Sequence, residues 1–247
     1  MLLPCGLAAT YGRPFTVLPD GELTELPFDL LVDSGGQWLA DRGGAIVAAH
    51  PFQGEPALPR HVLVVGDPET REALPPLPES RLESEMVAAH FAGSKILLGR
   101  DATPESVTAG LPEAELFHYS GHGFAAGGTV GLYLAGQAMT PVLIRNISLG
   151  RCQLAVLSAC STAMDPTTGS RRTLSLVRAL LDAGARTVVA TRWQVDSSAG
   201  LALMTGFYER LRSSGDAAAS LRGASRAVRA DVRFAHPFYW AAYQIYR

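Results

Sequence analysis

Short apolar runs alternate with amphipathic segments along most of the chain, and from residue 60 onward most of these runs end in a glycine-rich or polar turn. Apolar runs of four or five residues are typical of buried parallel strands. We expect strands at 61–65, 95–98, 116–120, 131–135, 154–158, 187–191 and within 239–246, and helices near 80–92, 103–110, 174–183, 197–213 and 216–230. This alternation predicts an α/β fold in which helices cover both faces of a mainly parallel sheet.

The first quarter of the chain differs in composition and in its pattern of apolar residues. Residues 1–59 are rich in glycine and proline, and their short apolar runs predict short strands and one helix near 27–41. We therefore expect an N-terminal segment over 1–59 and a catalytic core over 60–247, together forming one structural domain. Excision of this domain from a longer chain is one of the alternatives that the sequence leaves open.

Helix-start signals precede several of these segments. Ser80 and Glu83 match a capping box, and Thr103 precedes a proline at the start of the next helix. Asp196 stands just before a long helical pattern, where a carboxylate caps the first free N–H groups.

Two of the expected strands run directly into residues that can carry chemistry. The strand 116–120 ends in Gly121-His122-Gly123, and the strand 154–158 is followed by Ala159 and Cys160. Open α/β sheets place their sites at the carboxyl ends of the strands, and neighbouring strands lie about 4.8 Å apart. If these strands are neighbours, an imidazole and a thiol flank one substrate carbonyl.

This pair of side chains suits nucleophilic catalysis on a peptide bond. A free thiol is only a few per cent thiolate at neutral pH, so a nearby imidazole matters to its reactivity. In this hypothesis Cys160 attacks the carbonyl, His122 transfers the proton, and the amides of Gly123 and Cys160 stabilise the oxyanion. The sequence identifies no third member of a triad.

Ordinary structural roles compete with this interpretation. A cysteine at the end of an apolar strand is often a small buried hydrophobe, which is also our expectation for Cys5 and Cys152. His118 and His122 have a spacing that could suggest zinc, but a strand and a turn need not bring their nitrogens together. We expect His118 to be a hydrogen-bonded core residue, and we expect no metal at this pair.

Several spaced motifs beyond the dyad resemble one protein family. They are FHYSGHG, LAVLSACST, LVRALLDAGARTVVATRWQV, LMTGFYERL, AASLRGASRAVR and FYWAAYQIY, with LPFDLLVD, VVGDP and LESEMVAAHF upstream. The chain resembles the CHAT family of caspase-like cysteine peptidases over about residues 12–247. The resemblance implies a caspase-like three-layer α/β/α sandwich without a metal or organic cofactor. It also implies His122 as general acid/base, Cys160 as nucleophile and Gly123 as an oxyanion amide.

The candidates for the substrate pocket are Ser120, Ser158, Trp193 and Asp196. Related peptidases that cut after basic residues often place an acid shortly before the cysteine, where this chain has the neutral Ser158. Asp196 follows Trp193 near the second acidic position of that family, but we favour a helix-capping role for it. The residue preceding the cleaved bond is therefore left open.

Composition and charge limit the partners. Hydrophobic residues make up 47% of the chain, and neither a secretory signal nor a membrane-length apolar run occurs, so we expect a cytoplasmic protein. Residues 1–144 carry 17 acids and 7 bases, whereas residues 145–247 carry 6 acids and 14 bases. The basic half could attract an anionic partner, but no nucleic-acid motif accompanies it, and we do not expect direct nucleic-acid binding.

Three function classes remain open. The first is a cysteine endopeptidase acting on protein or peptide substrates, and the second is a catalytically silent binding or scaffold module. The third is a thiol esterase or acyltransferase, because the first chemical step is the same. The resemblance further implies control by a sensor or repeat domain, in the same chain or in a separate partner, and a possible role in bacterial defence.

Overall fold

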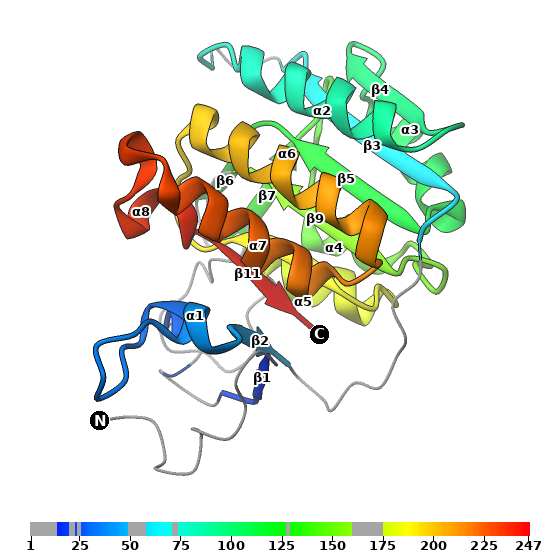
Figure 1. The fold of residues 1–247 in the computed structure, drawn as a ribbon. Helices are drawn as coiled ribbons and strands as arrows, with labels where there is room; N and C mark the ends of the chain where they lie inside the picture. Colours follow the sequence, from blue (N-terminus) through cyan, green and yellow to red (C-terminus); the bar gives the residue numbers. More distant parts are fainter. Residues whose placement is uncertain are drawn as a thin grey trace.

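The computed structural model describes residues 14–19, 23, 26–48, 58–70, 74–126, 129–159 and 175–247. Its centre is an eight-stranded sheet (Figure 1). In spatial order the strands are β1 (Phe15–Val17), β2 (Ala45–Val47), β11 (Tyr243–Tyr246), β10 (Val188–Thr191), β9 (Leu154–Ser158), β5 (Leu116–Ser120), β3 (Val62–Pro68) and β4 (Lys95–Gly99). Only the pairing of β10 with β11 is antiparallel in this sheet as described. The expected mainly parallel sheet is confirmed.

Helices cover the sheet on both faces (Figure 1). One layer holds α2 (Pro78–His90), α6 (Ser197–Ser214) and α7 (Ala217–Ala230), and the other holds α3 (Pro104–Gly110), α4 (Pro141–Arg145) and α5 (Leu176–Asp182). The short helices are α1 (Leu39–Arg42), α8 (Pro237–Trp240), η3 (Phe28–Leu30), η4 (Leu111–Glu113) and η5 (Val232–Phe234). Every helix within the described ranges is too short or too polar to cross a membrane.

The central strands are buried on both faces because their side chains alternate between two cores. On β5, Phe117 and Tyr119 enter the core beneath α3 to α5, whereas Leu116 enters the core beneath α2, α6 and α7. Successive strand residues point to opposite faces, so His118 and Ser120 share the face of Leu116. This alternation determines which residues meet α2 and α6 near the ends of the strands.

A small antiparallel sheet follows β5 almost at once. It consists of β6 (Gly123–Ala126), β7 (Thr129–Tyr133) and β8 (Ala138–Met139). Leu132 and Met139 anchor it in the core beneath α3 to α5. The strand expected at 131–135 is therefore β7, displaced by two residues.

The prediction of a helix near 27–41 is wrong. The structure has η3 and α1 instead, joined by an isolated bridge between Val32 and Trp38. The carboxylate of Asp33 accepts the N–H groups of Gly35 and Gln37, which closes a turn where the helix would have continued.

The prediction that Ser80 and Glu83 form a capping box is also wrong. Helix α2 begins at Pro78, a residue suited to the first helical turn, so both predicted capping residues lie inside the helix. Glu83 is buried, and its carboxylate lies against His118. The capping predicted for Asp196 is confirmed, since its side chain accepts the N–H of Ala199 at the start of α6.

Candidate active site

The two strands that lead to the predicted dyad are neighbours. Strands β5 and β9 are parallel, and their register pairs Ser120 with Ser158. His122 and Cys160 each follow this pair by two residues along their own strands. Cys160 lies outside the described residues, so its role as nucleophile stays a prediction. The dyad hypothesis requires that the ends of β5 and β9 lie next to each other, and this part of the prediction is confirmed.

A main-chain carbonyl orients the candidate base. His122 is partly exposed, and its Nε2 lies 2.7 Å from the carbonyl oxygen of Pro75. A carbonyl oxygen can only accept a hydrogen bond, so Nε2 carries the proton and donates it. The other ring nitrogen, Nδ1, is then left with a lone pair that can accept a proton from a thiol.

Pro75 is a partner of the candidate base that sequence reasoning missed. It contributes a backbone oxygen, which any residue has, so its identity gives little signal. The one available sign was the run Pro75-Pro76-Leu77-Pro78. Proline fixes φ and restricts the preceding residue to extended backbone, which holds the carbonyl in a set direction.

The turn around His122 is tightly packed. A Cβ at Gly121 would lie 2.8 Å from the Tyr119 hydroxyl oxygen and 3.0 Å from Cδ of Pro68, so only glycine fits. The Tyr119 hydroxyl lies 2.7 Å from the carbonyl oxygens of both His122 and Tyr133, and it can donate its proton to either. The turn is thereby held to the small sheet on one side and to β5 on the other.

The second glycine has an outward-facing amide. The Tyr133 N–H donates to the His122 carbonyl, and Gly123 is paired with Leu132. This makes Gly123 and Leu132 a non-hydrogen-bonded pair, in which the Gly123 N–H points away from β7. The geometry is compatible with the predicted oxyanion role, which itself stays a prediction.

The pocket candidates have different surroundings. Ser120 is buried, and the Ser158 hydroxyl lies 2.8 Å from the hydroxyl of Tyr243, which sequence reasoning did not select. The indole N–H of Trp193 donates to the carbonyl of Phe238 at 2.9 Å. Asp196 is exposed and caps α6, which is the ordinary role that we favoured.

His118 is a fully buried residue, as expected. Its Nδ1 lies 2.9 Å from the Tyr208 hydroxyl, and its Nε2 lies 3.1 Å from Oε1 of Glu83. His118 and His122 therefore have separate partners. Among the described residues, no group of three His, Cys, Asp or Glu side chains could hold a metal ion.

The cysteines differ in what can be said of them. Cys152 is buried in the core beneath α3 to α5, and burial raises the pKa of its thiol to about 12. It is an unreactive packing residue, as predicted. Cys5 lies outside the described residues.

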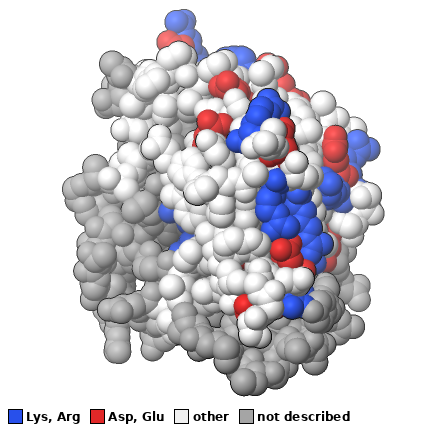
Figure 2. Space-filling model, turned by 60° about the vertical axis from the view of Figure 1, so that its left-hand side comes forward, with Lys and Arg blue, Asp and Glu red and all other residues white. Residues whose placement is uncertain are grey.

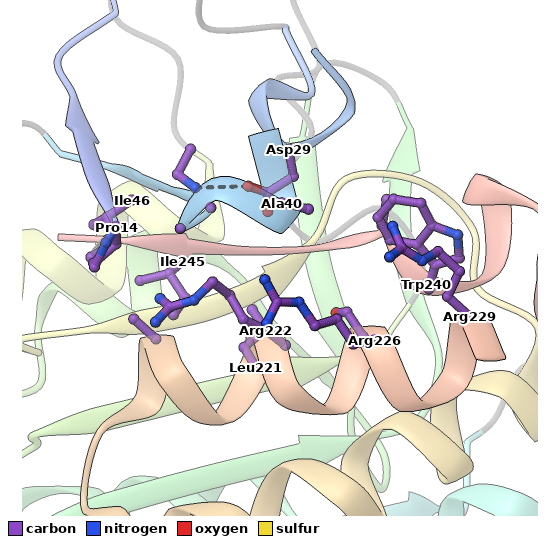
Figure 3. A pocket seen from close by; sticks show the side chains of 16 residues that line it. Pro14, Asp29, Ala40, Ile46, Leu221, Arg222, Arg226, Arg229, Trp240 and Ile245 are labelled. Atoms are coloured by element: carbon purple, nitrogen blue, oxygen red, sulfur yellow. Dashed lines mark hydrogen bonds between the residues drawn. The ribbon is translucent and has the colours of Figure 1, made fainter. Parts of the chain in front are cut away.

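A pocket away from the strand ends lies between the N-terminal segment and α7 (Figure 3). Its lining includes none of the predicted site residues that the structure describes. Burial raises the pKa of its Asp29 carboxyl to about 6, against opposing effects from the Ala45 N–H, Arg222 and Arg192. Asp29 Oδ1 accepts the Ala45 N–H at 2.7 Å.

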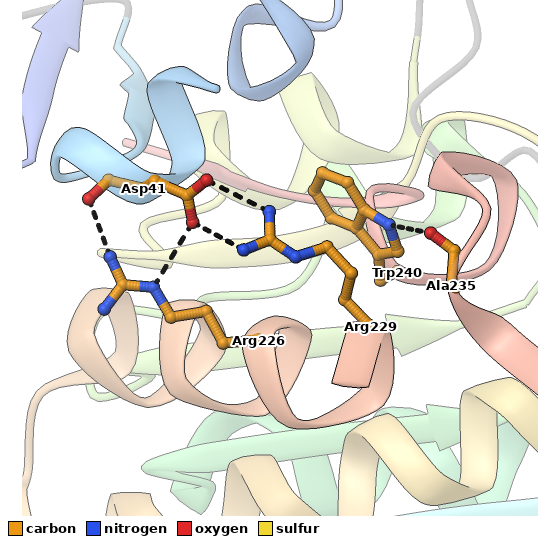
Figure 4. Close-up of polar contacts among 5 residues, drawn as sticks. All are labelled: Asp41, Arg226, Arg229, Ala235 and Trp240. Carbon is orange, nitrogen blue, oxygen red and sulfur yellow. Dashed lines mark hydrogen bonds and ion pairs between the residues drawn. The ribbon is translucent and has the colours of Figure 1, made fainter. Parts of the chain in front are cut away.

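An ion-pair cluster closes the same junction (Figure 4). Arg229 holds the Asp41 carboxylate with both terminal nitrogens and lies over the Trp240 ring. Arg226 donates to the Asp41 carbonyl at 2.8 Å. On the face shown in Figure 2, basic side chains likewise stand beside acidic ones.

The chain was compared with known proteins. A family model described as the CHAT domain matches residues 4–247. Tetratricopeptide repeat protein 28 of Homo sapiens is 23% identical over 94% of this chain, and its Mus musculus counterpart is 25% identical over the same share. The chain spans only 12% of the length of these relatives.

Solved structures share the fold at low sequence identity. The separase–securin complex of Saccharomyces cerevisiae has a TM-score of 0.61 and 16% identity, covering 91% of this chain and 14% of that one. The Arg-specific cysteine proteinase gingipain R has a TM-score of 0.52 and 10% identity, covering 76% of this chain and 46% of that one. These likenesses agree with the expected caspase-like fold, and the family match covers nearly the whole sequence. The chain belongs to the CHAT domain family.

Proposed function

We propose that this chain is a cysteine endopeptidase that cleaves protein substrates with a dyad of Cys160 and His122. The observation that carries the proposal is the pairing of Ser120 with Ser158, because both candidate residues follow this pair at equal distance along adjacent parallel strands. The hydrogen bond from His122 to Pro75 adds support, since it leaves Nδ1 free to act as a base.

The reaction begins when His122 Nδ1 takes the proton of the Cys160 thiol. The thiolate sulfur forms a bond to the peptide carbonyl carbon, and the C=O electrons move to oxygen, where the amides of Gly123 and Cys160 stabilise the negative charge. His122 then gives its proton to the departing amine as the C–N bond breaks. Water releases the acyl group from sulfur, with His122 again accepting and returning a proton.

The surroundings of the pocket candidates support an uncharged residue before the cleaved bond. Ser120, Ser158 and Trp193 are neutral, and the carboxylate of Asp196 already caps α6. A substrate arginine or lysine would need a carboxylate at the base of its pocket to offset the loss of hydration. We therefore expect cleavage after uncharged residues in a peptide library.

The test is a peptide-library digest with the wild type, Cys160→Ala and His122→Ala. Each variant should lose cleavage by at least about a thousandfold, since members of a catalytic unit act together. Matched controls are Cys152→Ala, which removes a buried thiol outside the site, and His61→Ala, whose ring is exposed. Full cleavage by either dyad variant would remove the mechanism. Ester probes cut in place of peptides would indicate the esterase alternative, and a wild type that stays silent with its regulatory domain present would indicate a scaffold.

Control by a repeat domain is part of the same proposal. The curated relatives are named for tetratricopeptide repeats, and this chain matches only a small part of them. We propose that a sensor or repeat domain, in the same chain or in a partner, regulates the peptidase. A cytoplasmic location and a role in bacterial defence stay predictions.

A further inference from the structure

A chain of three buried polar groups crosses the core beneath the candidate base. It joins Glu83 on α2, His118 on β5 and Tyr208 on α6, and the side chains of Glu83 and His118 are only 4% and 0% exposed. We propose that Glu83 and His118 are positioning residues that hold α2 against β5 and thereby keep the Pro75 carbonyl in place for His122. This inference rests on the proposed function.

The protons in this chain follow from its partners. Burial raises the pKa of Tyr208 well above its usual value, with Glu83 and Tyr243 adding to the effect, so the phenol stays neutral. Nε2 of His118 lies 3.1 Å from Oε1 of Glu83, where two lone pairs would repel, so one of these two atoms carries a proton. Nδ1 either accepts the Tyr208 proton or, in the imidazolium, donates to its oxygen.

Glu83 and His118 depend on each other. Their contact is within ion-pair distance but off the direction of the ring N–H, and neither Oε1 of Glu83 nor Nε2 of His118 has a hydrogen-bond partner among the described residues. No lysine or arginine forms an ion pair with Glu83 in the described ranges. The surroundings are apolar, with Tyr208 packed edge-on against Phe91 and Phe207, so the attraction is little screened.

Helix α2 and strand β5 are therefore tied together at two points. At one, the segment just before α2 supplies the Pro75 carbonyl to His122. At the other, Glu83, in the second turn of α2, meets His118, four residues before His122. Both ties join the same two pieces of chain, so a shift of α2 along β5 changes both.

This coupling has a chemical consequence for His122. The Nε2 to carbonyl distance is 2.7 Å, and a displacement of about 1 Å would exceed hydrogen-bond range. Without that acceptor, the ring can place its proton on Nδ1 and lose the lone pair that the mechanism requires. Misplacement of about 1 Å from a remote change can cost on the order of a hundredfold in rate.

The first experiment compares Glu83→Gln with Glu85→Gln. Both changes remove one carboxylate from α2 while keeping its shape, but Glu85 is exposed and serves as the matched control. The nitrogen NMR shifts of the His122 ring report its tautomer without any substrate. Glu83→Gln should move these shifts toward a mixture of tautomers and lower kcat/KM tenfold to a hundredfold with an altered pH profile, whereas Glu85→Gln should match the wild type.

A second variant separates positioning from stability. The double change Glu83→Leu with His118→Leu removes both polar groups, and apolar replacement of a buried pair often restores or raises stability. We expect this variant to be folded, with His122 ring shifts still altered. Wild-type shifts in this variant or in Glu83→Gln would overturn the inference.

The readouts also separate this inference from the proposed function. A wild type that cuts no peptide would count against the peptidase, yet the His122 ring shifts would still decide whether Glu83 and His118 position the ring. Conversely, cleavage that depends on Cys160 but is unaffected by Glu83→Gln would leave the peptidase standing and remove only the positioning role.

Discussion

Two of the polar contacts that join helices to the rest of this molecule differ in their access to water. Glu83 and His118 lie between α2 and β5 with almost no exposed surface. Asp41, by contrast, meets Arg226 and Arg229 at the junction of the N-terminal segment with α7, where the three side chains are 26%, 52% and 29% exposed. If Glu83 or His118 is removed, no water can reach the group that is left. If Asp41 or one of its arginines is removed, water can hydrate the group that is left.

The difference teaches what each cluster can contribute. Breaking a buried pair leaves a charge in a medium that cannot hydrate it, so the loss is large. Breaking an exposed pair exchanges one weak attraction for hydration, so the loss is small. The buried pair is suited to fixing one arrangement of α2, and the exposed cluster to a weaker attachment of the N-terminal segment.

The largest expected effect comes from removing Glu83 outright. Glu83→Ala should lower the free energy of unfolding by about 3–5 kcal/mol, because it leaves His118 without its carboxylate and opens a cavity. Urea denaturation measures this change. Glu85→Ala, on the exposed face of the same helix, is the control and should leave the urea midpoint nearly unchanged. Equal effects of the two variants would break the distinction between buried and exposed groups.

A medium effect on the free energy of unfolding is expected at Asp29. This carboxyl lies at the same junction of the N-terminal segment with α7 but is buried, so it tests burial at that junction. Its folded pKa of about 6 exceeds the ordinary value of 3.8, so the folded state binds the proton more tightly between these values. Stability therefore falls as pH rises through this window, by about 1–3 kcal/mol. Asp29→Asn keeps an acceptor for the Ala45 N–H and should be more stable than the wild type at pH 7.5 but not at pH 4. A constant difference across this pH range would contradict the assignment.

The smallest effect is expected at the exposed cluster. Asp41→Asn should lower the free energy of unfolding by about 1 kcal/mol or less, because water and salt already weaken its attraction to the two arginines. Thermal unfolding at low and high salt measures it, and the difference from the wild type should shrink at high salt. A loss comparable to that of Glu83→Ala would mean that exposure does not separate the two regions.

The sequence predicted the central sheet well because physical demands on it are local. Strands β5 and β9 have the bounds expected from the runs Leu116–Ser120 and Leu154–Ser158, since residues buried on both faces must be almost continuously apolar. Their adjacency, which the predicted dyad requires, is what the structure shows for the ends at Ser120 and Ser158. The capping of α6 by Asp196 was likewise a local matter of one side chain and a nearby N–H.

Three features were not predicted correctly, because each depends on a contact that sequence spacing does not encode. Ser80 and Glu83 have the spacing of a capping box, but the helix begins three residues earlier than that box requires. The same glutamate then meets a histidine 35 positions away. Pro75 acts through a carbonyl oxygen that every residue possesses. The expected helix near 27–41 failed because Asp33 binds two backbone N–H groups and closes a turn.

The pairing of β2 with β11 has a consequence for synthesis on the ribosome. The Gln244 side chain donates to the Ala45 carbonyl across 199 positions of sequence, and Ile46 pairs with Ile245. At roughly 5–20 residues per second, the nascent segment that contains β2 waits about 10–40 s for its partner strand to emerge. During that interval a short apolar strand edge is uncovered, so chaperone capture of the growing polypeptide should persist until β11 has been translated.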